Sequence, residues 1–176
     1  VNAKDYGIPQ HRVRVITVSV KKEFYTHSIF DELEEKKVIA KSLEHYLSDH
    51  DREEILFIDK YQLTMPLHKK NKLLIRKATI KGFIEVDPGS VVDLAVPTSK
   101  TRRGRRILDG SCPTITTKKV LGVVQKDLSI RYLSSLEAFR FMGFADQDHY
   151  KASKVCTENQ LYKQAGNSIV VDMFLA

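Results

Sequence analysis

The chain has 176 residues, of which 42% are hydrophobic and 29% are charged, and its formal net charge is +7. This apolar content excludes a disordered chain, and no apolar run approaches the roughly 20 residues that a membrane-spanning helix needs. The amino terminus has neither a secretory nor a transit pattern. We therefore expect a folded protein located in the cytosol or on the nucleoid.

The excess positive charge lies in the middle of the chain. Residues 1–50 carry 8 basic and 8 acidic side chains and residues 129–176 carry 5 of each, whereas residues 51–128 carry 16 basic and 9 acidic ones. Two clusters there contain no acidic residue: Lys69, Lys70, Lys72, Arg76, Lys77 and Lys81 form the first, and Lys100, Arg102, Arg103, Arg105 and Arg106 form the second. Clustered cations bind nucleic acid because each neutralised phosphate releases condensed counterions. A solvated lysine-rich face is the alternative.

In the first half, residues 13–20 are rich in β-branched side chains and predict a buried strand. Residues 31–37 are charged and helix-prone, and residues 42–47 form the pattern of a short amphipathic helix that Ser42 begins. Between residues 54 and 98, short apolar runs alternate with Asn, Gly, Pro and Asp turn signals, which predicts a small β-rich lobe. The apolar runs cover residues 55–58, 73–75, 80–86 and 91–96.

The last part of the chain is predicted to be helical. Ser134 with Glu137, and Thr157 with Gln160, have the spacing of capping boxes that begin two helices. Gly143 and Gly166 are expected to stop these two helices. Leu136, Phe139 and Met142 share one helical face and are expected in the core.

Three short stretches carry the clearest functional signal. They are Asn-Ala-Lys-Asp-Tyr-Gly-Ile-Pro-Gln-His-Arg-Val-Arg at residues 2–14, a stretch rich in aromatic residues at 131–144, and Gln-Ala-Gly-Asn-Ser-Ile at 164–169. Together and in this order they resemble the eighth, ninth and tenth motifs of the cytosine-5 DNA methyltransferase family. The family's Phe-x-Gly-x-Gly cofactor loop, Pro-Cys-Gln nucleophile loop and Glu-Asn-Val strand have no counterpart in the sequence. The chain is therefore similar to the carboxy-terminal part of such an enzyme, either as a separate subunit or as a truncated chain.

The resemblance implies an α/β fragment, with strand and helix pieces of a Rossmann-like methyltransferase domain and a small β-rich target-recognition lobe. Residues 1–50 and 151–176 would belong to the catalytic domain, and residues 51–150 to the lobe that reads DNA. The implied partners are double-stranded DNA and an amino-terminal methyltransferase half in the bacterial cytosol or nucleoid. The implied cofactor is S-adenosylmethionine.

Arg12 and Arg14 are two residues apart, so that on an extended backbone both point to one face together with Gln10. Paired guanidinium groups can hold a phosphate or a base edge with forked hydrogen bonds. The resemblance implies that Arg14 contacts the flipped cytosine and its backbone, while Arg12 supports the active site. A salt-bridging pair at a strand end is the alternative reading.

The last motif predicts a helix start, with Asn167 as N-cap, Ser168 and Ile169 in the first turn, and Gly166 allowing close backbone approach. The resemblance places Asn167 and Ser168 beside S-adenosylmethionine. An ordinary helix start is the alternative. The mostly apolar residues 168–176 would need another surface to cover them.

Residues 111–117 resemble the family's segment in which Thr114 lies close to the target phosphate. Cys112 lies in this segment without the Pro-Cys-Gln setting, and we expect a small buried or loop thiol rather than a nucleophile. Cys112, Cys156 and the six histidines show no spacing of metal ligands. The chain alone is therefore expected to be catalytically silent. A stand-alone DNA-binding module and a tRNA-methylating relative are the alternative functions.

Overall fold

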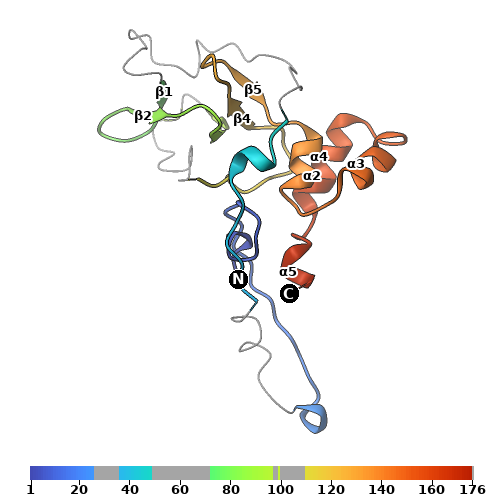
Figure 1. Cartoon of the computed structure of the whole chain (residues 1–176). Helices are drawn as coiled ribbons and strands as arrows, with labels where there is room; N and C mark the ends of the chain where they lie inside the picture. The colour runs from blue at the N-terminus through green and yellow to red at the C-terminus, as the bar shows by residue number, and fades with distance from the viewer. Residues whose placement is uncertain (26–35, 49–71, 97–98, 100–109, 176) are drawn as a thin grey trace.

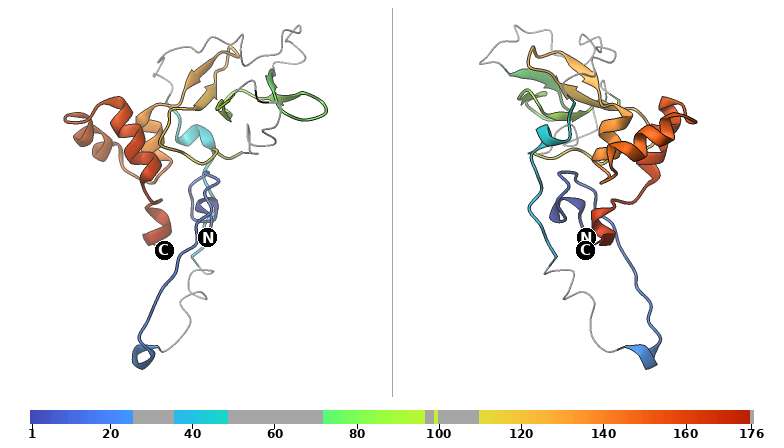
Figure 2. Two further views of the ribbon diagram at one scale, coloured as in Figure 1. Left: turned by 180° about the vertical axis from the view of Figure 1, so that it is seen from behind. Right: turned by 45° about the vertical axis from the view of Figure 1, so that its right-hand side comes forward.

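The computed structural model describes residues 1–25, 36–48, 72–96, 99 and 110–175 (Figure 1). The helices α2 to α4 lie beside two small β-sheets, and the two ends of the chain lie close together in every view (Figure 2). The 3-10 helices are η1 (Ala3–Asp5), η2 (Lys22–Phe24) and η3 (Leu43–His45). The strands are β1 (Leu73–Arg76), β2 (Phe83–Val86), β3 (Val91–Asp93), β4 (Leu121–Val124) and β5 (Ile130–Tyr132). The α-helices are α2 (Ser135–Arg140), α3 (Asp146–Ser153), α4 (Glu158–Asn167) and α5 (Asp172–Leu175).

The strands form one two-stranded and one three-stranded antiparallel sheet, with the orders β1-β2 and β3-β4-β5. One apolar cluster joins the two sheets: Leu73, Ile75, Val86, Val92, Leu94, Val124 and Ile130. The predicted strands within residues 73–75, 80–86 and 91–96 are confirmed, while residues 55–58 lie outside the described part. A side chain at Gly122 in β4 would come within 2.6 Å of Leu94 and 2.7 Å of Ile130, so the glycine allows this packing.

The helices α2 and α4 begin as their capping residues predict. Both capping boxes are formed, Ser134 with Glu137 and Thr157 with Gln160. Gly143 has a φ of 83°, which confirms the predicted left-handed stop after α2. Phe139 and Met142 are buried and Leu136 is half-buried, so the predicted apolar face lies mainly in the core.

A second and larger apolar cluster joins the first motif to the helices. Ala3, Tyr6 and Ile8 pack there with residues of α2 and α4. Tyr46, which follows η3, stacks on Phe141 with 5.1 Å between ring centroids, and its hydroxyl donates to the carbonyl of residue 7. The core thus brings together residues from both ends of the chain.

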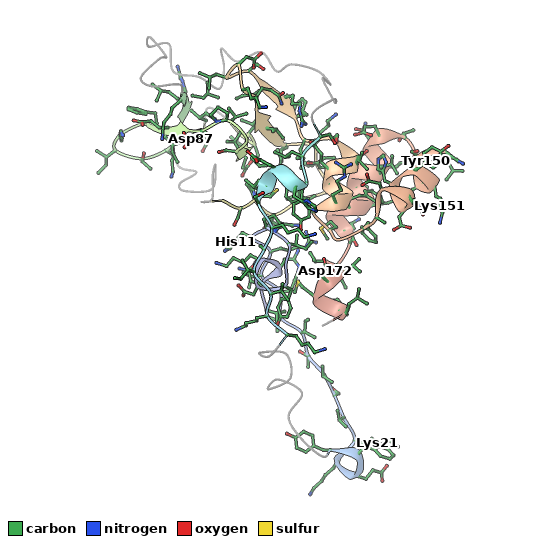
Figure 3. The ribbon with its side chains drawn as sticks, viewed as in Figure 1. His11, Lys21, Asp87, Tyr150, Lys151 and Asp172 are labelled. Carbon is green, nitrogen blue, oxygen red and sulfur yellow. The ribbon has the colours of Figure 1, made fainter. Side chains whose placement is uncertain are left out.

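The predicted buried strand at residues 13–20 is wrong in this structure. Val13 forms an isolated bridge with Asn2, and the backbone of Arg14 pairs with that of Val1. No described residue is bridged to Val15 or to the residues after it, and Val15 is 93% exposed. The segment leads into an extended arm with Lys21 at its far end (Figure 3). β-Branched residues favour the extended backbone, but a strand becomes buried only where a neighbouring strand and a packed face are present.

Two helix predictions also need correction. The helix predicted at residues 42–47 is the single 3-10 turn η3, and the Ser42 side chain makes no cap hydrogen bond. α4 continues through Gly166 and Asn167 and ends at Ser168, whose amide bonds the carbonyls of Gln164 and Ala165. Asn167 is therefore the end of one helix rather than the N-cap of the next, and α5 begins only at Asp172. The charged residues 31–35 lie outside the described part.

Candidate functional site

A buried guanidinium connects the first and the last motif. Arg12 Nη1 donates to the carbonyl of Ile115 at 2.8 Å. Its Nη2 donates to the carbonyls of Gly166 at 3.1 Å and Ser168 at 2.7 Å. Arg12 is only 3% exposed. One side chain thus connects three segments that are far apart in the sequence, and we call this arrangement the Arg12 clamp.

The charge of Arg12 is held by carbonyl dipoles. Burial and, to a smaller extent, the nearby charge of Arg14 lower the pKa of Arg12 to about 10. The guanidinium still stays protonated at neutral pH, and Nε is buried without a hydrogen-bond partner among the described residues. Arginine suits this position because its planar group offers five donors in a fixed geometry.

Arg14 has a different environment. Its side chain is exposed, and Nη1 donates to the carbonyl of Val13 at 2.7 Å. The backbone amide of Arg14 pairs with the carbonyl of Val1. The two arginines therefore differ in exposure, because Arg12 is buried in the clamp and Arg14 faces solvent.

Gln10 is fully buried. Its Nε2 donates to the carbonyl of Phe141 at 2.6 Å, and its Oε1 accepts from the amide of Ile115 at 3.3 Å. The predicted DNA contact of Gln10 is not compatible with this position, because both ends of the amide are used inside the protein. Gln10 instead connects the first motif to the segment that follows α2 and to the segment containing Thr114.

Thr114 lies directly beside the first motif. Its hydroxyl donates to the carbonyl of His11, and the amide of His11 donates to the carbonyl of Cys112 at 2.9 Å. Thr114 is half-buried. The structure therefore brings Thr114, Arg12 and Arg14 into one region of the molecule. The other predicted DNA-binding residues lie outside the described part: Lys100, Arg102, Arg103, Arg105 and Arg106.

Gly166 allows α4 to touch the segment of Thr114. A Cβ atom at this position would lie 2.3 Å from the carbonyl carbon and 2.4 Å from the oxygen of Thr116, and 2.5 Å from the nitrogen of Thr117. These are backbone atoms, which cannot move aside as a side-chain end can. The predicted close backbone approach at Gly166 is confirmed.

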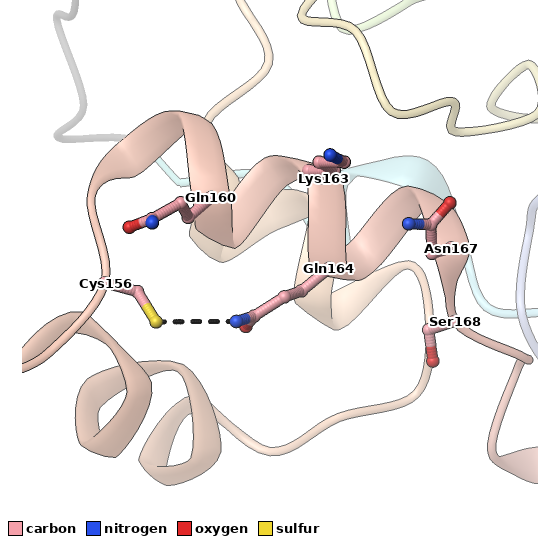
Figure 4. A pocket seen from close by; sticks show the side chains of 6 residues that line it. All are labelled: Cys156, Gln160, Lys163, Gln164, Asn167 and Ser168. Atoms are coloured by element: carbon pink, nitrogen blue, oxygen red, sulfur yellow. Dashed lines mark hydrogen bonds between the residues drawn. The ribbon is translucent and has the colours of Figure 1, made fainter.

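Asn167 and Ser168 border an open hollow of about 500 Å³ along one side of α4 (Figure 4). The other lining residues are Cys156, Gln160, Lys163 and Gln164. Asn167 is exposed and Ser168 is half-buried, with its hydroxyl donating to the carbonyl of Ile169 at 3.0 Å. The side chains that line the hollow carry amide, hydroxyl, thiol and ammonium groups, but most of the accessible lining surface is apolar.

Cys112 has the properties of a structural thiol. It is fully buried, its Sγ lies 3.2 Å from the carbonyl of Pro113, and burial raises its pKa well above the ordinary value. A thiolate is the nucleophilic form of cysteine. The prediction that Cys112 is not the nucleophile therefore agrees with its position. No cluster of metal-ligating side chains and no helix able to cross a membrane occurs among the residues described.

One buried ion pair, between Arg131 and Glu137, is not indicated by any pattern in the sequence. Arg131 Nη1 donates to Glu137 Oε2 at 2.8 Å, and the other oxygen of Glu137 accepts from the amide of Ser48 at 2.8 Å. Arg131 also donates to the carbonyl of Ser48. Glu137 was predicted as a capping residue, but nothing in its spacing from Arg131 or Ser48 indicates that the three meet.

A family model described as C-5 cytosine-specific DNA methylase matches residues 1–176, the whole chain. The chain is 32% identical over 181 residues to the orphan methyltransferase M.SssI of Spiroplasma monobiae, covering 100% of this chain and 42% of the relative. It is 29% identical over 185 residues to the type II methyltransferase M2.ScrFI of Lactococcus lactis subsp. cremoris, covering 97% of this chain and 41% of the relative.

A shorter match reaches the orphan methyltransferase M.SPBetaI of Bacillus phage SPbeta, with 40% identity over 81 residues, 42% of this chain and 18% of the relative. The chain thus spans about two fifths of the length of the curated relatives that it matches along its whole length. The mixed α/β fold, with two small sheets and helices, is compatible with a fragment of a methyltransferase. The match over every residue shows that the chain belongs to the C-5 cytosine-specific DNA methylase family.

Proposed function

We propose that this chain is the carboxy-terminal, DNA-recognising portion of a cytosine-5 DNA methyltransferase that methylates C5 of a flipped cytosine. The observation that carries the proposal is the Arg12 clamp, which holds the first motif, the segment of Thr114 and the last motif in one place. A methyltransferase needs its target base and its methyl donor next to each other, and base flipping brings the base to the donor. The Arg12 clamp meets this requirement because it holds the first motif and the segment of Thr114, which would contact the target base, next to the last motif, which would contact the methyl donor.

On the target side, Arg14 is the residue available to bind DNA. Its exposed guanidinium can donate forked hydrogen bonds to a phosphate or a base carbonyl. Arg12 acts as a positioning residue, since its Nη donors are committed to protein carbonyls. Thr114 lies at the same edge and would stand close to the target phosphate. The basic residues 100–106 would add further phosphate contacts in a recognition domain over residues 51–150.

On the cofactor side, Asn167 and Ser168 would border S-adenosylmethionine. Both lie at the open hollow beside α4, where the amide of Asn167 and the hydroxyl of Ser168 are the polar groups we assign to the amino-acid end of that molecule. When bound, S-adenosylmethionine supplies the methyl group. The protein groups would orient it with the side-chain amide of Asn167 and the hydroxyl of Ser168 rather than with helix amides, because the amide of Ser168 is already used within α4.

The nucleophile would come from an amino-terminal methyltransferase half. Covalent catalysis on cytosine requires an activated thiolate and an acid near the base. Cys112 is buried and its pKa is raised, and Cys156 lies at the α4 hollow without a base within the described contacts. The chain would therefore be active only together with a polypeptide that carries the Pro-Cys-Gln loop.

The test is transfer of labelled methyl from S-adenosylmethionine to duplex DNA. We expect turnover when the chain is combined with an amino-terminal half that carries the nucleophile, and none with either part alone. Arg14→Ala should abolish most turnover in the complex, while Lys151→Ala on the far helix α3 serves as the matched control. Robust turnover by the isolated chain would contradict the division of roles.

Two other functions remain as outcomes of further tests. A DNA-binding module without catalytic function predicts that Asn167→Ala changes neither DNA binding nor methylation in any complex. A tRNA-methylating relative predicts that tRNA displaces duplex DNA from the chain at one fixed salt concentration. Preference for duplex DNA, with loss of methylation in the Asn167 variant, supports the proposal.

A further inference from the structure

The hairpin formed by β1 and β2 projects from the rest of the molecule. Its tip loop extends past the edge of the fold in Figure 1, and it projects on the opposite side after the half turn in Figure 2. Leu73, Ile75 and Val86 face inward and are buried in the cluster that joins the two sheets. The hairpin is thus anchored by one face, while its tip stands away from the core.

The tip presents an apolar side chain between positive charges. Ile80 is fully exposed. Residues 76–83 read Arg-Lys-Ala-Thr-Ile-Lys-Gly-Phe and contain three cations and no acidic residue. Lys81 lies over the Phe83 ring at 4.8 Å and 3.7 Å from Glu85. A fully exposed isoleucine at the end of a basic hairpin has no role in the protein's own core.

The tip is also ordered by its own backbone. The backbone amide of Lys77 donates to the carbonyl of Gly82 at 2.9 Å, and the backbone amide of Gly82 donates to the carbonyl of Thr79 at 2.9 Å. Gly82 has a φ of 75°, which a side chain would disfavour. The hydrogen-bonded turn therefore holds Ile80 outward. Binding through Ile80 would lose little conformational entropy, because the loop is already ordered.

We propose that the tip of the β1–β2 hairpin enters a groove of duplex DNA, with Ile80 against the bases and Lys77 and Lys81 at the flanking phosphates. The major groove admits a two-stranded ribbon, and apolar side chains contact thymine methyl groups there or wedge between base steps. Charge complementarity selects DNA over an apolar protein surface, because the cations surround the isoleucine. This inference rests on the proposed function, since the chain must bind DNA.

The experiment is duplex binding by the 176-residue chain across a range of salt concentrations. Ile80→Ser should weaken binding about fivefold or more with an unchanged salt slope, because it removes a contact to bases and not to phosphates. The double variant Lys77→Ala/Lys81→Ala should lower the slope of log affinity against log salt by about 2, as expected for two lost phosphate contacts. Ile39→Ser is the matched control, because Ile39 is also exposed, at 93%, but lies outside the hairpin.

The outcomes distinguish failure of the proposed role of the hairpin from failure of the proposed function. If the wild-type chain binds DNA and Ile80→Ser binds as well as Ile39→Ser, the role of the hairpin is overturned and the proposed function stands. If the wild-type chain binds no duplex at low salt, the proposed function fails and the role of the hairpin fails with it. Circular dichroism of each variant checks that the fold is retained.

A crosslink supplies a readout that does not depend on affinity. Ile80→Cys, in a Cys156→Ser background that leaves the buried Cys112 as the other thiol, should exchange with a mixed disulfide tethered to a base in a duplex groove, so that the protein–DNA disulfide forms and the small thiol of the mixed disulfide is released. Ile39→Cys in the same background should not. Equal crosslinking at both positions would overturn the groove assignment.

Discussion

The Nη2 atom of Arg12 lies 2.7 Å from the backbone carbonyl of Ser168, across 156 positions of the sequence. The same guanidinium holds the carbonyl of Ile115. Because Arg12 donates to backbone carbonyls and not to side chains, it constrains the backbone positions of the segments it contacts, whichever side chains those segments carry. The Arg12 clamp therefore fixes the relative position of the first motif, the segment of Thr114 and the end of α4.

Replacing Arg12 should destabilise the fold far more than replacing Arg14. Arg12→Met keeps the length of the side chain but removes donors from three carbonyls, and the expected loss is about 3 kcal/mol of unfolding free energy. Arg14→Met alters an exposed side chain and should change stability by less than about 0.5 kcal/mol. Urea denaturation followed by circular dichroism measures both. Similar losses in the two variants would show that the clamp does not stabilise the fold.

Gly166→Ala should reverse the usual effect of alanine in a helix. Alanine normally stabilises a helix by about 1 kcal/mol relative to glycine. Here the added methyl group would lie 2.3 Å from the backbone of Thr116, so we expect a net loss of stability or displacement of that segment. The matched control is Asn167→Ala, the next residue of α4, which is exposed and should be neutral. The melting temperatures of the two variants decide the comparison, and a stabilised Gly166→Ala protein would contradict the close approach.

Much of this arrangement could be predicted from the sequence where the cause is local. The capping boxes at Ser134 and Thr157, the stop at Gly143 and the close approach at Gly166 depend on residues within a few positions or on the absence of a side chain. The burial of Arg12 could not be predicted in this way, because all its partners are carbonyls, and every residue has one. The spacing of Arg12 and Arg14 likewise did not indicate that Arg12 is buried while Arg14 is exposed.

The exposed segment after Arg14 fails as a strand prediction for a related physical reason. Its β-branched residues specify an extended backbone, and the structure gives them one. Pairing, in contrast, needs a second strand, and no described residue supplies it for Val15 or Val18. Local sequence sets the backbone conformation of a segment, whereas its burial depends on which other segments pack against it.

The buried ion pair between Arg131 and Glu137 should be costly to break on one side only. Glu137→Gln or Arg131→Met leaves its former partner buried with an uncompensated charge, and each should lose about 3–5 kcal/mol. The double variant should lose less than the sum of the two single variants. Urea denaturation of the four proteins in a double-mutant cycle measures the coupling. Additive losses would mean that the pair is energetically independent despite its 2.8 Å contact.

The two cysteines should differ in their reaction with a thiol reagent under native conditions. Cys156 is half-buried at the α4 hollow, with Gln164 Nε2 at 3.4 Å from its sulfur, and should react readily. Cys112 should react only on unfolding, because it is buried and its pKa is raised, which lowers the thiolate population. Counting fast and slow thiols with Ellman's reagent tests this, and Cys156→Ser should remove the fast phase. Two fast thiols in the folded protein would contradict the burial of Cys112.

Asp146 and Asp172, which line one hollow near Gly143, should affect stability with opposite signs. The hydrogen bonds from Arg140 lower the pKa of Asp146 from its ordinary 3.8, so its contribution is present above pH 3.8 and is lost as the pH falls through the lower folded-state value. Burial raises the pKa of Asp172 above its ordinary 3.8, so the folded state favours the protonated carboxyl group. The stability that Asp172 contributes is therefore present below pH 3.8 and is lost as the pH rises through the higher folded-state pKa. At pH 7, Asp146→Asn should therefore lower the melting temperature and Asp172→Asn should raise it.

The difference between Asp172→Asn and the wild-type protein should shrink as the pH falls toward 3.8, and that between Asp146→Asn and the wild-type protein should shrink only as the pH falls below 3.8, because the wild-type carboxyl groups then become neutral as well. Melting curves of the three proteins between pH 3 and pH 7 measure the effect. The exposure of Asp146 keeps its effect small, since solvent screens the pair with Arg140. A decrease in melting temperature for Asp172→Asn at pH 7 would mean that its carboxylate stabilises the start of α5 more than burial penalises it.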